Sequence, residues 1–443
     1  MNEKNVACGR KDFLKLALAG ASVGAVAAEA AAETVIPTPR WNGSKHPLAG
    51  KTMPKWQKGQ FQVHHIHTGV AESSFWIFPD GTTALVDCGC HPAINRGKYA
   101  VQVLPNGSRH SSEWIARYVE RVNPNGHDVD YMVLTHYHSD HGGAGWWGDG
   151  VIDWKDVRIM NSGFVQASKT LRFGIALDRC YPTYDQPIPA EKGTVDSLDQ
   201  FQKMYRYLSE KFGTKVERFR VGAVDQLVPR RDPESVAGFT VTNICGNGVI
   251  RTRDGGTRDL YARLHDLEKI DENSASTGVI VQYGAFRFLS AGDFAGGLKD
   301  PDGRCFNVES ELGKEIDPVD VAKISHHGYY STPPEYVRAV RPRVWTSCVW
   351  DQLHNEEHTM RNIATCTGYT EKRIIIPTVF PAERQISDAK MPWMPDIAPE
   401  SFGGCHVVIT VPPGGATYSV ACLDATDEKM KVLGAYDFKS KGI

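Results

Sequence analysis

A short segment of this chain places four metal-binding side chains within six residues, directly after an apolar run at 130–134 that is typical of a buried strand. These side chains are His136, His138, Asp140 and His141. Imidazole nitrogens and carboxylate oxygens are ligands that zinc prefers in proteins. Gly142 and Gly143 follow, and they allow the backbone to turn tightly beside an ion. Since a strand that ends in such a loop can direct several side chains at one point, the sequence predicts a metal site here.

Three other strand-like runs end in residues of the same kind. They are 84–86 before Asp87, 286–291 before Asp293, and 321–325 before His326 and His327. Carboxylate and imidazole groups at several strand ends can converge when those strands lie side by side in a sheet. The sequence therefore offers metal ligands from four separate strand ends.

The His-x-His-x-Asp-His spacing and the order of these strand ends resemble the metallo-β-lactamase superfamily over roughly residues 60–425. The Ser325-His326-His327-Gly328 segment, the Asn273-Ser274 pair and the Tyr283-Gly284 turn look most like its ComEC-type branch. That branch includes the extracytoplasmic metallohydrolase domain of DNA-uptake channels and many free-standing exported hydrolases. The resemblance implies an α/β fold of the αββα type, in which two mixed β-sheets are flanked by helices within a single catalytic domain.

The resemblance also implies a dinuclear zinc centre, with manganese or iron as alternative metals. The implied ligands are His136 and His138 for the first ion, Asp140 and His141 for the second, Asp293 as the bridge, and His326 or His327 to complete the second site. In this superfamily the last histidine stands where its strand ends, which favours His326. A turn that begins one residue earlier would select His327 instead.

Three further residues receive roles from the same resemblance. Asp87 is expected to orient the ligand loop from behind the metal, as metal-bound imidazoles require. Asp140 and His358 are the expected catalytic residues, with His358 as an acid for the leaving group or as a contact to the developing oxyanion. His354 is close enough in sequence to compete with His358 for that role.

One ligand of the superfamily pattern is missing from this chain. Its third motif usually supplies a histidine after a strand, but the strand-like run at 239–244 is followed by Cys245-Gly246-Asn247-Gly248. His265 is the only histidine in the sequence between His141 and His326. The first metal is therefore completed by an atypical ligand (Asn247, Cys245 or His265) or by a later histidine that folds back, or only one of the two sites is filled firmly.

The chemistry implied by this centre is hydrolysis by a hydroxide shared between two zinc ions. The ComEC-type resemblance favours a phosphodiester or related phosphoester as substrate. The alternatives are hydrolysis of an amide, lactone or thioester by the same centre, and a metal-binding protein without turnover. The net charge of −2 gives no strong signal for a nucleic-acid polymer, so a small molecule or a phosphoester is the expected partner.

The first part of the sequence predicts export. A basic segment at 9–15 precedes an apolar run at 16–28 that is too short to span a membrane, and small residues follow. We interpret residues 1–32 as a cleavable, twin-arginine-like export signal, which implies a periplasmic or extracellular protein with no stable membrane span in the mature chain. The expected organisation then comprises a linker at 33–58, a catalytic domain at 59–430 with an insertion or cap at 150–235, and a tail at 431–443.

Overall fold

The computed structural model describes residues 38–91, 94–96, 99–143, 150–184, 198–264, 270–294, 297–300 and 302–442. All of them belong to one compact unit, Ile36–Ile443. The predicted export signal and His265 lie outside the described residues.

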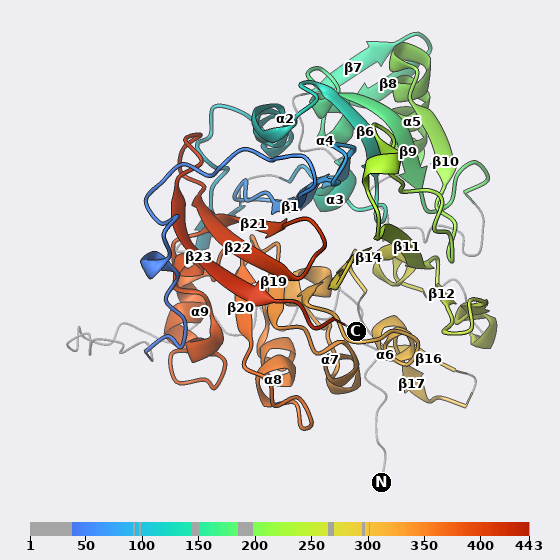
Figure 1. Ribbon diagram of the computed structural model, residues 1–443. Coiled ribbons are helices and arrows are strands. Elements are labelled where there is room, and N and C mark those ends of the chain that lie inside the picture. The colour runs from blue at the N-terminus through green and yellow to red at the C-terminus, as the bar shows by residue number, and fades with distance from the viewer. Residues whose placement is uncertain are drawn as a thin grey trace, which may run out of the picture. The chain divides into compact units, whose positions relative to one another are not determined.

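Two large mixed sheets dominate the structure (Figure 1). In spatial order the nine-stranded sheet contains β10 (Lys215–Arg218), β9 (Arg172–Asp178), β6 (Asp128–Val133), β3 (Thr83–Cys88), β2 (Ser73–Ile77), β1 (Phe61–His65), β21 (Cys405–Val411), β22 (Thr417–Asp424) and β23 (Val432–Lys439). The eight-stranded sheet contains β13 (Thr257–Asp259), β12 (Val249–Arg251), β11 (Phe239–Gly246), β14 (Gly278–Tyr283), β15 (Phe286–Ala291), β18 (Val321–Lys323), β19 (Val344–Ser347) and β20 (Ile374–Pro377).

Smaller elements connect these strands. The two-stranded pairs are β4 (Ile94–Arg96) with β5 (Tyr99–Val101), β7 (Val151–Trp154) with β8 (Val157–Met160), and β16 (Leu298–Lys299) with β17 (Cys305–Phe306). The α-helices are α2 (Ser111–Val122), α3 (Ser139–Gly142), α4 (Gly163–Ala167), α5 (Leu198–Phe212), α6 (Val308–Gly313), α7 (Pro334–Val340), α8 (Glu357–Thr365) and α9 (Ala382–Ser387). Short 3-10 turns include η1 (Gly43–Lys45), η5 (Glu272–Ala275) and η6 (Ser325–Gly328).

Three apolar clusters define the layers, and strand alternation explains them. Along β6 and its end, Tyr131 and Val133 pack between the two sheets, whereas Met132 and Leu134 pack against α2, α4 and α5. In the second sheet, Phe288 faces the same inter-sheet core while its neighbour Leu289 packs with α7 and α8. Helices therefore cover the outer face of each sheet, which confirms the αββα sandwich.

The parallel strands bring the site together. β3, β6 and β9 run parallel in the first sheet, and β15, β18 and β19 run parallel in the second. Because the carboxyl ends of parallel strands meet at the same edge of a sheet, the loops after these strands lie close together.

The structure differs from the expected organisation in three segments. β9 and β10 extend the nine-stranded sheet, and α4 and α5 pack in its core, so much of 150–235 is part of the sandwich and not a separate cap. β23 forms the edge of the same sheet, so regular structure continues beyond residue 430. Residues 50 and 53 donate backbone hydrogen bonds to Val432 and Met430, so this part of the expected linker is tied to the domain. Among the described helices, none combines the length and the apolar character needed to cross a membrane.

Buried histidines lie on β1 and just after it. The His64 imidazole lies 3.0 Å from the Tyr118 hydroxyl on α2, and the His67 amide donates to His406 Nδ1 at 3.0 Å. Burial lowers the pKa of His64 to about 3 and that of His67 to about 4. These contacts give His64 and His67 a structural role in packing α2 on the sheet.

We expect the free energy of unfolding to fall as the pH is lowered from about 6.5 toward about 4. In this window the unfolded chain takes up protons on His64 and His67, while the folded chain keeps both neutral because their folded pKa values are depressed. Each histidine contributes a slope of up to about 1.4 kcal/mol per pH unit. Urea unfolding at several pH values measures the free energy of unfolding and hence this slope. The variant His64→Gln should have a slope that is smaller by up to about 1.4 kcal/mol per pH unit, the contribution of one histidine. An equal slope in the wild type and this variant would contradict the assignment.

Candidate metal centre

The ligand loop starts where β6 ends and runs into α3. Asp87, at the end of the neighbouring strand β3, accepts hydrogen bonds from the Thr135 amide (2.9 Å) and hydroxyl (2.8 Å). The other end of the loop is fixed by the Asp140 carbonyl, which accepts a hydrogen bond from the Glu72 amide at 2.8 Å. The loop that carries the histidines is thus held by contacts at both ends.

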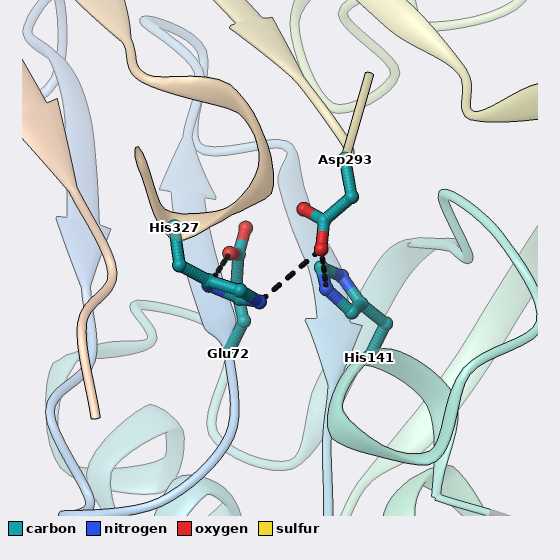
Figure 2. A group of neighbouring side chains, drawn as sticks. All are labelled: Glu72, His141, Asp293 and His327. Carbon is teal, nitrogen blue, oxygen red and sulfur yellow. Dashed lines mark hydrogen bonds and ion pairs between the residues drawn. The ribbon is translucent and has the colours of Figure 1, made fainter. Parts of the chain in front are cut away.

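Four side chains from three segments point at one position. The Asp293 Oδ2 atom lies 3.0 Å from His141 Nε2 and 3.2 Å from His327 Nε2. Asp140 Oδ2 lies 3.3 Å from His327 Nε2 and 4.0 Å from His141 Nε2. Figure 2 shows Asp293 between His141 and His327. Four donors placed tetrahedrally at the ~2.0–2.1 Å that zinc takes with nitrogen and oxygen lie about 3.3 Å apart, so this spacing fits a single ion.

Each histidine of this group presents its Nε2 atom to the site because a carboxylate or carbonyl engages the other ring nitrogen. His141 Nδ1 lies 2.7 Å from Asp87 Oδ2, and His327 Nδ1 lies 2.8 Å from the carbonyl oxygen of Cys348. This is the arrangement by which proteins fix the tautomer and the ring orientation of metal-binding histidines. Asp87 therefore lies behind His141, on the ring nitrogen that faces away from Asp293.

Buried polar atoms without a hydrogen bond also test whether these residues fit a cation. Within the described residues, no hydrogen-bond partner reaches Asp293 Oδ1 or Asn273 Oδ1, although both atoms are buried. Such atoms are costly unless an ion or another group satisfies them. The residues present therefore fit a divalent metal, by the type, spacing and unsatisfied state of their donors.

Charge leads to the same conclusion. Burial by itself raises the pKa of Asp293, but His141 and His327 outweigh burial and hold the pKa well below its usual range. Conversely, Asp293 and its neighbouring carboxylates raise the pKa of His141 and His327 well above the usual value, although burial acts in the opposite direction. Protons on the two imidazoles thus balance the buried carboxylates here. A metal ion would replace them, so metal binding should release protons.

Glu72 is a member of this cluster that the sequence did not reveal. Single donor atoms of Glu72, His141, Asp293 and His327 all lie within 4.8 Å of one another. The Glu72 carboxylate, however, faces His327 Nδ1 at 3.2 Å and pairs with the buried Lys323 ammonium at 2.8 Å (Figure 2). We therefore favour Asp140 as the fourth ligand, because Glu72 lies on the far side of the His327 ring and Lys323 already neutralises it. Glu72 comes from an irregular segment between β1 and β2, where no motif marks it.

The first pair of histidines, His136 and His138, has fewer neighbouring candidate ligands than the group around Asp293. His136 Nε2 and His138 Nδ1 face each other at 3.0 Å, a separation that two ligands of one ion can have. Burial, together with the neighbouring His141 and His138, lowers the pKa of His136 well below its usual value. A neutral imidazole is the form that binds a metal.

Two of the three expected third-motif substitutes, Cys245 and Asn247, lie in the described part of the chain, and both have other contacts. Cys245 packs in the apolar cluster between the second sheet and its helices, and burial raises the pKa of its thiol. Asn247 Oδ1 accepts a hydrogen bond from the Arg179 guanidinium at 2.5 Å. The Asn247 side chain is thus engaged by Arg179, and Cys245 faces a different layer of the fold.

His327, and not His326, contacts the other second-site residues. The strand β18 ends at Lys323, two residues earlier than the expected run at 321–325, and both histidines adopt left-handed backbone conformations with φ near 50°. His326 Nε2 instead lies 3.4 Å from the Asn273 side-chain amide. The expected preference for His326 assumed a strand that continued to Ser325, and the early turn removes that assumption.

Gly328 completes this turn. It has φ of +81°, and a Cβ atom there would lie 2.7 Å from Asn355 Oδ1. The close approach lets the Asn355 amide donate to the His327 carbonyl at 2.9 Å. A glycine is therefore required to hold the His327 backbone against the loop that follows β19.

His354, and not His358, lies beside the site. The His358 side chain is exposed in the first turn of α8. The His354 ring stacks on His327, with ring centroids 4.5 Å apart and an angle of 22° between the planes. The expectation for His358 rested on a loose sequence match, and the helix that starts at Glu357 turns this residue toward solvent.

We expect His327→Ala to lose the second-site ion, because it removes a donor 3.2 Å from Asp293, whereas His326→Ala should retain that ion. Plasma mass spectrometry of the two purified, dialysed variants measures the bound metal. The two neighbouring substitutions are equal in size, so each serves as the control for the other. Metal depletion in His326→Ala alone would contradict the assignment of His327.

Comparison with known families supports the fold and the ligand loop together. Residues 67–168 match the family model described as metallo-beta-lactamase superfamily, and this range contains Glu72, Asp87 and the loop from His136 to His141. A search of the curated proteins finds no match for this chain. This part of the chain is thus similar to the metallo-β-lactamase superfamily, and the two-sheet architecture is consistent with that similarity.

Proposed function

We propose that this protein is a metal-dependent hydrolase. The observation that carries the proposal is the group formed by Asp140, His141, Asp293 and His327, whose carboxylate oxygens lie 3.0–4.0 Å from the Nε2 atoms of the two histidines, a spacing that one zinc ion can bridge. When bound, such an ion lowers the pKa of a water molecule and polarises the bond to be cleaved. His136 and His138 are the proposed ligands of a second, neighbouring ion, and Asp293 is the proposed bridge.

His354 is the proposed hydrogen-bond donor to the substrate. Its Nδ1 atom accepts hydrogen bonds from the backbone amides of Trp350 (3.3 Å) and Asp351 (3.2 Å). Burial and the neighbouring His327 lower the pKa of His354 well below its usual value. A neutral ring that accepts at Nδ1 must carry its proton on Nε2, so His354 presents a fixed N–H donor next to His327. Such a donor can contact a negatively charged oxygen or a leaving group.

A phosphodiester or related phosphoester is the proposed substrate. The Ser325-Gly328 segment and the Asn273-Ser274 pair support this choice, since both resemble the ComEC-type branch, and the structure places His326 of the first beside Asn273 of the second. A small phosphodiester is more consistent with the net charge of −2 than a nucleic-acid polymer is. Hydrolysis of an amide, lactone or thioester is the alternative for the same centre.

We expect Asp293→Asn to lower both the metal content and the hydrolysis of bis-(p-nitrophenyl) phosphate, by at least ~100-fold in kcat/KM, because one carboxylate would serve both ions. His354→Gln should keep the metal and lose mainly kcat.

Asp153→Asn, at an exposed position on β7, is the matched control and should behave like the wild type. Full activity with normal metal in Asp293→Asn would refute the proposed centre. Turnover of carbonyl esters or lactones without phosphodiesterase activity would support the alternative substrate class.

Export is part of the proposal and rests on the basic and apolar segments at 9–28. We expect the mature protein from an extracytoplasmic fraction to lack residues 1–32. Mass spectrometry of its amino terminus tests this. An intact amino terminus on a protein confined to the cytoplasm would be incompatible with the predicted signal.

A further inference from the structure

Directly behind the ligand loop lies a buried ion pair that no step of the proposed reaction uses. Arg179, just after β9, donates from Nε to Glu272 Oε1 at 2.8 Å and from a terminal nitrogen to Glu272 Oε2 at 2.6 Å. Both side chains are only 2% exposed. Bidentate pairing is the strongest geometry that a guanidinium and a carboxylate can adopt, and it fixes both groups in one orientation.

This ion pair surrounds Tyr137, the residue between the two first-site histidines. Glu272 Oε1 also accepts the backbone amide of Tyr137 at 2.9 Å, and the Arg179 guanidinium lies over the Tyr137 ring at 4.3 Å. The Tyr137 hydroxyl donates to Asp178 at 2.8 Å. The amide, the ring face and the hydroxyl of one residue are thus all held. Because the backbone at Tyr137 sets the relative direction of His136 and His138, these contacts fix the two imidazoles relative to each other.

The same ion pair also holds the segment from which the missing third-motif ligand would come. Arg179 donates to Asn247 Oδ1, and the Asn247 amide group donates back to the Arg179 carbonyl, both at 2.5 Å. Glu272 is the first residue of η5, which also carries Asn273. The contacts of Arg179 and Glu272 therefore join the loops at 136–138, 245–248 and 272–275 on one side of the first histidine pair.

We propose that Arg179 and Glu272 are positioning residues that preorganise His136 and His138 for the first metal ion. The inference rests on the proposed metal centre. The decisive contact is the one from the Tyr137 amide to Glu272, and Arg179 keeps the Glu272 carboxylate in place for it. Asn247, the residue in the third-motif segment, is hydrogen-bonded to Arg179. The ion pair instead supports the first metal position by holding His136 and His138 rigidly.

Two double variants isolate this contact. Arg179→Met with Glu272→Gln removes both charges but keeps a side-chain oxygen for the Tyr137 amide. Arg179→Met with Glu272→Leu removes the charges and that oxygen. Replacing both members of a buried ion pair avoids leaving one charge without a partner. Arg258→Met with Glu311→Leu is the matched control, since it removes another ion pair (2.9 Å) whose residues pair with Glu315 and Lys314 and not with the ligand loop.

The measurement is a Co²⁺ titration of the metal-free protein, followed by its visible absorption and by thermal unfolding. The variant His138→Ala assigns the steps of the titration: the cobalt-binding step that is lost in this variant belongs to the first site. We expect the Arg179→Met, Glu272→Leu variant (Met/Leu) to bind cobalt at the first site at least ~10-fold more weakly and with an altered spectrum. Loss of a contact that supports a metal ligand typically weakens metal binding by this much. The Arg179→Met, Glu272→Gln variant is called Met/Gln. The Met/Gln variant and the control should bind within a few-fold of the wild type, and affinity at the second site should not change.

Equal first-site affinities in the Met/Leu and Met/Gln variants would overturn the inference, and so would an equal loss at both sites. If the Met/Leu variant does not fold, Glu272→Asp takes its place. The aspartate side chain keeps the ion pair with Arg179 but is too short to reach the Tyr137 amide as well. It should show the same selective loss, and unchanged first-site affinity in it would also overturn the inference. A wild-type chain that binds a single ion would overturn both the dinuclear centre and the inference. Normal cobalt binding without any hydrolysis would count against the proposed function alone.

Discussion

Buried negative charge at the strand ends is the constraint on which this site depends. Asp140 and Asp293 both lie against His141 and His327, Asp87 lies behind His141, and Glu72 lies behind His327. Lys323 offsets the charge of Glu72. Carboxylates at this depth are stable only when cations or protons balance them, since burial of an uncompensated charge is strongly unfavourable. Divalent metal ions satisfy that requirement and would also supply the chemistry of hydrolysis.

The sandwich makes such a concentration of charge possible. Each sheet contributes parallel strands that end at the site, and the loops are joined across the two halves. The Thr277 amide, before β14, donates to the Thr135 carbonyl at 3.0 Å, and the Gly292 amide, after β15, donates to the Thr277 carbonyl at 3.0 Å. A backbone connection therefore runs from the His136 loop to the Asp293 loop. Neither sheet alone could hold both sets of ligands at this spacing.

The two proposed metal positions differ in how they are held. At the second position, four side chains face one point, and all four belong to loops that follow parallel strands of the two sheets. At the first position, two histidines face each other, and the order around them comes from a buried network centred on Arg179 and Glu272. The positions thus illustrate two ways to fix ligands, through direct convergence of several strands and through rigid support behind a short loop.

The sequence by itself determined the fold class and the segments that carry the candidate ligands, because both depend on local patterns. Alternating apolar runs that end in histidine or aspartate predict strand ends, and the spacing from His136 to His141 places four donors in one loop. Tertiary structure decided the rest.

Glu72 joins the cluster only through the packing of the segment between β1 and β2 against α3. The choice of His327 depends on a strand that stops at Lys323 and on a left-handed turn stabilised by Asn355. His354 replaces His358 because α8 begins at Glu357 and carries His358 to the surface. Each of these outcomes depends on contacts between residues far apart in the chain, and short-range sequence patterns do not encode them.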